Sequence, residues 1–267
     1  MLHNHSSASG AHAHKRFTRA FFATTAAGAV VAAGLAAASL AAAAPAMAAP
    51  KAPATASTAA CPAVLEIVAR ASTEAAGTGV IGSLADDVQG DVNATVGIEA
   101  VVYPATLQNY SSSVGQGDTA MEADVTNALS SCPGEKIILL GYSQGAQVVG
   151  DTLAGGGGTS LGDAETAPIS STAAASVIAA IQFGDPRHQP NLSPIDLGTD
   201  PGAQGIFAVE SNQSRAAFGT ILRSWCDTGD PFCAGGDNLE AHLDYTTKYD
   251  SAANTFIEGR LSAAGIS

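Results

Sequence analysis

The stretch of sequence that most constrains the fold is residues 136–149, which read KIILLGYSQGAQVV. Four consecutive aliphatic residues precede a Gly-x-Ser-x-Gly motif, and a helix-compatible run follows it. This order is typical of a buried parallel strand that turns sharply into a helix, with Ser143 at the apex of the turn. Gly141 and Gly145 leave room for the strand and the helix to approach each other closely. The N-terminus of that helix then faces any negative charge that develops beside Ser143.

The N-terminal region has the pattern of a secretory signal peptide. Three basic residues and four histidines lie within residues 1–19, and no further charge occurs before Lys51. The Ala-rich run between them ends in a small-x-small cleavage pattern, so we expect a signal peptide at 1–48 and a secreted, extracellular protein. An uncleaved membrane anchor is the alternative, because the uncharged run is long enough to span a bilayer. Residues 49–60 are predicted to form a flexible linker.

The remaining part, residues 61–267, is long enough for one domain with a sizeable core. Three of the 11 Lys and Arg residues lie in 1–48, whereas all 24 Asp and Glu residues follow it, which leaves a mature net charge of about −16. Such an acidic protein has no electrostatic footprint for nucleic acid or for an anionic membrane. We therefore expect a neutral substrate and no stable membrane insertion after signal cleavage. We also expect a monomer.

All four cysteines lie in the mature part, which suits an oxidising compartment. Four cysteines allow three pairings, and the sequence alone does not choose between them. The short separation of Cys226 and Cys233 favours that pair, which leaves Cys61 with Cys132. A zinc site is the alternative, but there is no Cys-x-x-Cys spacing and only two histidines follow residue 48. We predict no metal and no cofactor.

Strand-like and helix-like segments alternate along the mature chain. Strands are predicted at 64–69, 98–103, 137–140, 177–183 and 221–225, and helices at 80–92, 120–129, 144–153 and 254–261. This alternation predicts a mostly parallel sheet covered on both faces, a three-layer α/β/α sandwich. In such sheets ligands bind outside the carboxyl ends of the strands, which is where Ser143 would lie.

Two stretches interrupt the alternation. Residues 155–158 are four glycines, which predict a flexible loop. Residues 184–218 are rich in Pro, Gly, Asp and Asn and are too long for an ordinary α/β connection. They form either a cover over the site or an ordered excursion, and the sequence leaves both open.

A serine hydroxyl becomes a good nucleophile when a base takes its proton, and histidine is the usual base. Only His188 and His242 lie in the mature part. In α/β-hydrolases the chain order is serine, acid, histidine, with the histidine on a late loop, which favours His242. His188 is expected to be a surface loop residue.

The acid partner is expected between Ser143 and the histidine. Asp230 fits because a Cys226–Cys233 disulfide would hold its loop rigid, whereas Asp227 and Asp185 are the rivals. The oxyanion would be bound by the backbone N–H of Gln144 and by Ser72, through its N–H or its hydroxyl. The alternative for the Ser-Thr-Glu sequence at 72–74 is a helix N-cap.

Four ordered motifs resemble the cutinase family of serine esterases: ARASTE at 69–74, GYSQGA at 141–146, CDTGDPFC at 226–233 and AHLDY at 241–245. The resemblance covers the domain from Cys61 to the last helix. It implies an α/β-hydrolase fold with a central five-stranded parallel sheet. It also implies the site residues, namely a triad of Ser143, Asp230 and His242, an oxyanion hole of Ser72 and Gln144, and the disulfides Cys61–Cys132 and Cys226–Cys233.

The resemblance implies a secreted carboxylic ester hydrolase that cleaves cutin-like polyesters and short-to-medium acyl esters through an acyl-enzyme. The 155–158 glycine run and the long 184–218 segment are more similar to the acetylxylan esterase branch of the family. Acetylxylan esterase and a lipase or phospholipase-like esterase are therefore alternatives. A secreted protein that keeps the fold only for binding is the non-enzymatic alternative.

Overall fold

The computed structural model describes residues 60–267, so the predicted signal peptide 1–48 and nearly all of the predicted linker lie outside the described residues. A parallel sheet in the order β2-β1-β3-β4-β6-β5 forms the centre of the domain. Its strands are β1 (Val64–Ala69), β2 (Val96–Ala100), β3 (Lys136–Tyr142), β4 (Val177–Phe183), β5 (Asp196–Leu197) and β6 (Leu222–Trp225).

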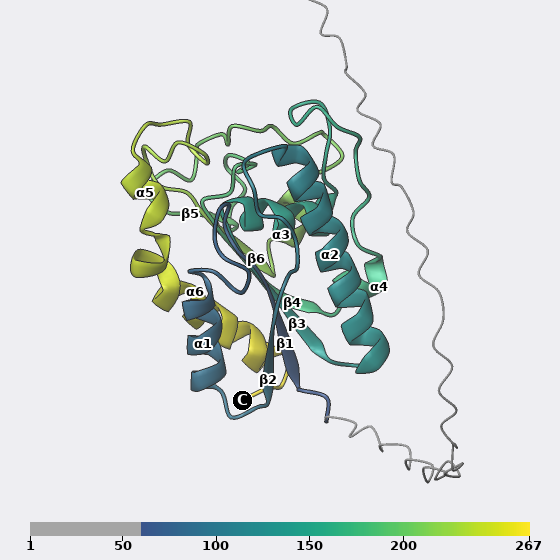
Figure 1. Cartoon of the computed structure of the whole chain (residues 1–267). Helices are drawn as coiled ribbons and strands as arrows, with labels where there is room; N and C mark the ends of the chain where they lie inside the picture. The colour runs from purple at the N-terminus through teal and green to yellow at the C-terminus, as the bar shows by residue number, and fades with distance from the viewer. Residues whose placement is uncertain (1–59) are drawn as a thin grey trace, which may run out of the picture. The chain divides into compact units, whose positions relative to one another are not determined.

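Helices cover both faces of the sheet (Figure 1). On one face, α1 (Gly82–Asp91) and α6 (Tyr245–Ala263) pack on apolar side chains that include Ile138 and Leu140. On the other face, α2 (Tyr110–Ser131) and α3 (Gln144–Ala154) pack on side chains that include Ile137 and Leu139. Successive side chains of a strand point to opposite faces of the sheet, so β3 contributes side chains to the apolar core on each face. The predicted three-layer α/β/α class is confirmed.

The structure differs from the predicted pattern in element bounds and in several short elements. The second and the last helix begin at Tyr110 and Tyr245 rather than at 120 and 254, and β2 covers 96–100 rather than 98–103. The sheet has six strands rather than five, because the two-residue strand β5 lies inside the 184–218 segment and pairs with β6. Two residues are too few to show a hydrophobic period. Three further elements are α4 (Ser171–Ala174), the 3-10 helix η1 (Arg215–Phe218) and α5 (Leu239–Leu243).

The 184–218 segment is an ordered excursion held down by buried ion pairs. Arg187 Nη1 lies 3.0 Å from Asp151 Oδ1, and Arg215 pairs with both Asp151 and Asp185. All four side chains are buried, and Asp151 belongs to α3. Removing one partner of a buried pair leaves an uncompensated charge, so these contacts tie the segment firmly to α3. Residues 155–158 are likewise buried, which corrects the expectation of a flexible loop there.

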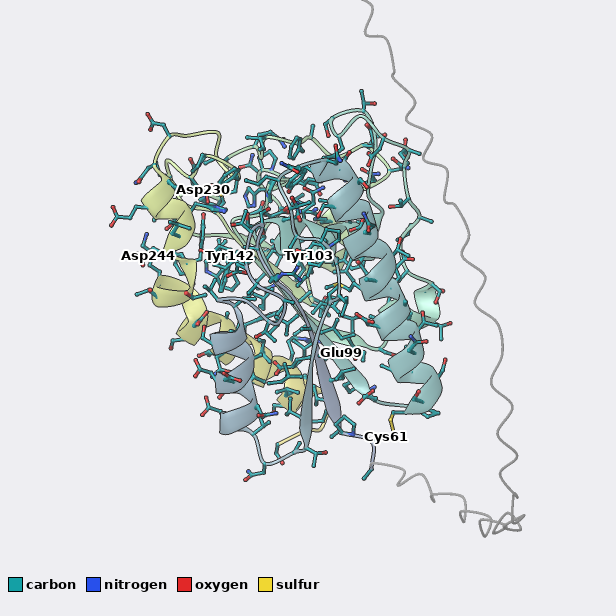
Figure 2. The ribbon with its side chains drawn as sticks, viewed as in Figure 1. Cys61, Glu99, Tyr103, Tyr142, Asp230 and Asp244 are labelled. Carbon is teal, nitrogen blue, oxygen red and sulfur yellow. A yellow bond between two sulfur atoms is a disulfide. The ribbon has the colours of Figure 1, made fainter. Side chains whose placement is uncertain are left out.

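The order of the strands in the sheet indicates where a ligand site is expected. After β1 the chain passes to the edge strand β2 and then returns to β3 on the other side of β1. The carboxyl ends of β1 and β3 therefore flank a topological switch point, where open α/β sheets bind ligands. Figure 2 shows Asp230 at this end of the molecule and Cys61 at the opposite end. Within residues 60–267, no helix has the length and apolar character needed to cross a membrane.

A carboxyl group is buried without compensation in the middle of β1. Glu66 is fully buried, and neither carboxylate oxygen has a hydrogen-bond partner among the described residues. Burial, and secondarily the charge of Asp86, raise the pKa of Glu66 to about 8. The folded protein therefore keeps this carboxyl protonated at pH values at which the unfolded chain ionises it.

We predict that Glu66 makes the folded state less stable as the pH rises. Below the unfolded pKa of about 4.5 the group is neutral in both states, and between that value and about 8 only the unfolded chain releases the proton. The Glu66→Gln variant should lose this dependence and exceed the parent in unfolding free energy at pH 8 by on the order of 3 kcal/mol. Denaturant unfolding at pH 5 and pH 8 measures the difference. Glu258→Gln, at an exposed position of α6, is the control and should behave as the parent. An equal pH response of parent and Glu66→Gln would contradict the prediction.

Candidate active site

Ser143 occupies a strained turn between β3 and α3. Its backbone φ is 54° and its ψ is −116°, a region that non-glycine residues rarely adopt. The Ser143 N–H donates to the carbonyl of Phe183 on β4 at 2.8 Å, and its own carbonyl accepts the first helical hydrogen bond of α3, from Gln147 N. The turn is thus fixed by the sheet on one side and by the helix on the other, and it directs the serine out of the sheet edge.

The two motif glycines allow a very close crossing of backbones. A Cβ on Gly145 would lie 1.9 Å from the carbonyl oxygen of Ala69 at the end of β1, and a Cβ on Gly141 would lie 2.3 Å from the carbonyl oxygen of Gly145. Any larger residue would push α3 away from β1 and β3. The glycines therefore set the distance between Ser143 and the loop that follows β1.

The structure brings Ser143, His242 and Asp230 into one hydrogen-bonded line. His242 Nε2 lies 2.9 Å from Ser143 Oγ, and His242 Nδ1 lies 2.8 Å from Asp230 Oδ2. Because an ionised carboxylate only accepts hydrogen bonds, Nδ1 carries the ring proton and Nε2 is left to accept from the serine hydroxyl. This is the tautomer that a general base needs. The His242 ring packs against Phe232, with the ring centroids 4.4 Å apart.

Asp230 lies in the loop closed by the Cys226–Cys233 disulfide. Its Oδ1 accepts hydrogen bonds from the backbone N–H groups of Phe232 and Cys233, at 2.7 and 3.1 Å. Burial opposes ionisation of this carboxyl, but the hydrogen bond and charge of His242 and the further donors outweigh burial, so the pKa of Asp230 lies below its ordinary value. The second disulfide joins Cys61 to Cys132, so both pairings are those that the resemblance implied.

The alternative candidates for the acid and the base have other partners in the structure. Asp227 accepts hydrogen bonds from Thr199 and Tyr249 and pairs with Lys248. Asp185 belongs to the buried ion pairs beneath α3. His188 is fully buried, 3.2 Å from Ser224 Oγ, and the expectation of a surface position is wrong. Local sequence patterns could not predict this burial, because the hydrogen-bond partner Ser224 lies 36 residues further along the chain.

The two predicted oxyanion residues, Gln144 and Ser72, both belong to the region around Ser143. Gln144 is the first residue of α3, where backbone N–H groups lack helical acceptors, and its side chain is held by Ser113 Oγ at 2.9 Å and by the Thr106 carbonyl at 3.1 Å. Ser72 lines the same cavity as Ser143, and its buried hydroxyl has no hydrogen-bond partner among the residues described. The neighbouring N–H groups of Ala71 and Thr73 are both engaged.

Glu74 is a site residue that the sequence reasoning treated only as part of a possible helix cap. Its carboxylate accepts from the N–H of Ala71 at 2.6 Å and from the N–H of Val80 at 2.9 Å, and so closes the loop that carries Ser72. The Arg70 guanidinium donates hydrogen bonds to the carbonyls of Glu74 and Tyr103, and so joins the same loop to the segment after β2. Carboxylate acceptors aimed at backbone N–H groups fix a loop without using water.

Ser143 and His242 open into a cavity of about 670 Å³. Its walls are mostly apolar and come from segments far apart in the chain: Val80, Leu107, Tyr110, Ile206, Phe207, Phe232, Leu239 and Leu243. Tyr110 and Phe207 stack with a centroid distance of 5.3 Å, and the Tyr110 hydroxyl donates to Gln147 Oε1. The 184–218 segment thus contributes a fixed wall of the cavity.

A parallel sheet with a serine on a strand–turn–helix corner at its switch point defines the class of α/β-hydrolases. A family model described as Cutinase matches residues 60–261. The chain is 36% identical to Acetylxylan esterase 2 of Talaromyces purpureogenus, over 75% of this chain and 88% of that protein. It is 34% identical to Cutinase 11 of Verticillium dahliae, over 77% of this chain and 71% of that protein.

Solved structures give the same result. The catalytic core domain of acetyl xylan esterase from Trichoderma reesei superimposes with a TM-score of 0.68 at 33% identity, covering 75% of this chain and 100% of that chain. The chain therefore belongs to the cutinase family, and it is a serine esterase of that family.

Because the backbones approach so closely at Gly145, we predict that a larger residue there lowers both the stability and the activity of the protein. Gly145→Ala should lower the unfolding free energy by about 3 kcal/mol or more, because the added methyl group meets the backbone of Ala69. It should also abolish esterase activity under conditions in which the variant is still folded. Thermal unfolding and hydrolysis of p-nitrophenyl butyrate measure the two effects.

The matched control is Gly259→Ala in the interior of α6, where nothing lies within 4 Å of the added Cβ. This variant should gain about 0.5–1 kcal/mol, because alanine is the better helix former. Similar stability changes at both glycines would show that the crossing is less tight than the structure indicates.

Proposed function

We propose that this protein is a secreted esterase that hydrolyses neutral carboxylic esters, with Ser143 as nucleophile, His242 as general base and Asp230 as the acid that orients it. The observation that carries the proposal is the His242 imidazole, which lies within hydrogen-bond distance of Ser143 Oγ on one side and of Asp230 on the other. Predicted secretion rests on the signal-like residues 1–48 and on two disulfides, which persist in oxidising compartments.

The reaction would proceed in two steps. Ser143 Oγ attacks the ester carbonyl carbon while His242 Nε2 takes the hydroxyl proton, and the N–H of Gln144 with the Ser72 hydroxyl binds the oxyanion. His242 then gives the proton to the leaving alcohol, and an acyl-Ser143 ester remains. Water, deprotonated by His242, attacks this ester and releases the carboxylic acid.

The surface around the cavity favours an apolar polyester, such as a cutin-like polymer, as substrate. Six large apolar side chains are exposed in the part of the chain that the structure describes, and five of them line the cavity: Val80, Leu107, Ile206, Leu239 and Leu243. Contiguous exposed apolar groups mark interaction sites. The acidic net charge disfavours anionic surfaces, so a neutral polyester or a neutral lipid ester fits best.

Acetylxylan esterase is the second candidate. It is favoured by the identity to Acetylxylan esterase 2 and by the superposition on the acetyl xylan esterase core domain. An acetyl group would fill little of a 670 Å³ cavity, however, and a hydrated polysaccharide gains little from an apolar rim. Rates on acetylxylan and on a cutin-like polyester, measured at equal enzyme concentration, distinguish the two candidates.

Removing the nucleophile should abolish hydrolysis. Ser143→Ala is expected to lower kcat for p-nitrophenyl butyrate by about a millionfold, because the three groups act as a unit. A fluorophosphonate probe should label the parent and leave the variant unlabelled. Full activity or labelling of a folded Ser143→Ala protein would exclude the mechanism, and an unlabelled parent would favour a binding protein without catalysis.

The apolar rim should matter more for insoluble than for soluble esters. Leu107→Ser removes a rim side chain that is 59% exposed, and it should lower polyester hydrolysis relative to p-nitrophenyl butyrate hydrolysis by about fivefold. Val102→Ser lies in the same loop after β2, is 88% exposed and does not line the cavity, so the ratio should stay at the parent value. Equal ratios for the two variants would contradict a role of the rim in docking.

A further inference from the structure

The Asp230 carboxylate is bound by a fourth donor that the three-residue mechanism does not use. Oδ1 accepts from the backbone N–H groups of Phe232 and Cys233, and Oδ2 accepts from His242 Nδ1. The hydroxyl of Tyr245 also donates to Oδ2, at 2.8 Å. The oxygen that faces the imidazole is therefore shared between two donors, both of which belong to buried side chains.

The direction of the Tyr245 hydrogen bond follows from its other partners. The backbone N–H of Asp227 donates to the Tyr245 hydroxyl at 2.8 Å, which occupies an acceptor position. Cys233 Sγ lies 3.2 Å away but belongs to a disulfide and has no proton. The single hydroxyl proton thus points at Asp230. Burial and the nearby Asp230 charge raise the pKa of Tyr245 far above its ordinary value, so the hydroxyl keeps this proton.

Local backbone geometry places His242 and Tyr245 on the same carboxylate. His242 lies in the last turn of α5 and Tyr245 is the first residue of α6, and Asp244 between them has a non-helical φ of −109° and ψ of 9°. The two rings are nearly perpendicular, at 84°, with centroids 6.2 Å apart. Phe183 stacks on the Tyr245 ring at 6.0 Å and fixes its orientation.

We propose that Tyr245 is a positioning residue of this esterase, which holds Asp230 Oδ2 in line with His242 Nδ1 and takes up part of the negative charge that stabilises the protonated imidazole. The inference rests on the proposed function. A carboxylate oxygen that already accepts from a hydroxyl attracts the imidazolium less strongly than one that does not. Tyr245 would therefore set the pH at which His242 becomes available as a base.

Four other titratable groups lie near His242, and variants of Tyr245 leave all four unchanged. Asp230 faces the ring from the disulfide loop, Tyr142 of β3 donates to the His242 carbonyl, Glu74 lines the cavity from the loop after β1, and Asp244 follows in the chain. The Tyr245 hydroxyl also accepts from the Asp227 N–H, but only its bond to Asp230 ends on the oxygen that binds His242. A shift of the pH profile caused by changing this hydroxyl therefore reports the bond to Asp230.

The test is the pH profile of kcat/KM for p-nitrophenyl butyrate with the full mature protein. Tyr245→Phe should lower kcat about tenfold through poorer alignment, leave KM within about twofold, and move the acid limb upward by about half a pH unit or more. Incorporating 3-fluorotyrosine at position 245 keeps the shape of the side chain and makes the hydroxyl a stronger donor. The acid limb should then move in the opposite direction, which keeps the test decisive even if Tyr245→Phe folds poorly.

Tyr249→Phe is the matched control. Tyr249 lies one turn further along α6, and the variant removes a hydroxyl that donates to Asp227 Oδ1 at 2.6 Å and makes no hydrogen bond to Asp230. It should leave the acid limb at the parent value. The inference is overturned if the profiles of the Tyr245 variants superimpose on the parent profile, or if Tyr249→Phe shifts it equally. These outcomes require an active, fluorophosphonate-labelled parent, whereas failure of the proposed function would show as an unlabelled one.

Discussion

The contact between the backbone of α3 at Gly145 and the end of β1 at Ala69 is the constraint on which the site depends. It brings the loop after β1, with Ser72 and Glu74, beside the turn after β3, with Ser143. Nothing larger than hydrogen fits at the crossing, so the relative placement of Ser143 and Ser72 is set by van der Waals exclusion. Hydrogen bonds then refine a geometry that packing has already fixed.

The buried ion pairs of the 184–218 segment connect this part of the site to the wall of the cavity. Asp151 lies on the same helix that begins behind Ser143, and it binds Arg187 and Arg215 of the segment. The helix that follows Ser143 therefore also anchors the cavity wall that carries Ile206 and Phe207. A wall tied in this way has a defined shape before any substrate binds, which lowers the entropy lost on binding.

Local patterns predicted the parts of the structure that local interactions determine. The strands 64–69 and 177–183 were predicted to the residue, because continuous aliphatic runs mark buried parallel strands. The motif around Ser143 likewise predicted the turn. The sequence could not reveal β5, the burial of His188 or the donor role of Tyr245, because these depend on partners 12 or more residues away that only the fold brings together. The start of α2 at Tyr110 was missed because serines and glycines hide its period.

The four hydrogen-bond donors on Asp230 keep its buried carboxylate ionised, and they do so in a region from which water is excluded. A buried carboxylate without any hydrogen-bond donor would take up a proton, and the donors on Asp230 prevent this by holding its pKa below the ordinary value. In the proposed mechanism, exclusion of water would also strengthen every hydrogen bond to the oxyanion. The rim is apolar, and the ordered 184–218 segment that forms one wall of the cavity is bound to α3 by ion pairs to Asp151. An apolar ester pressed against the rim would itself complete the exclusion of water, so the choice of substrate and the strength of catalysis would depend on the same surface.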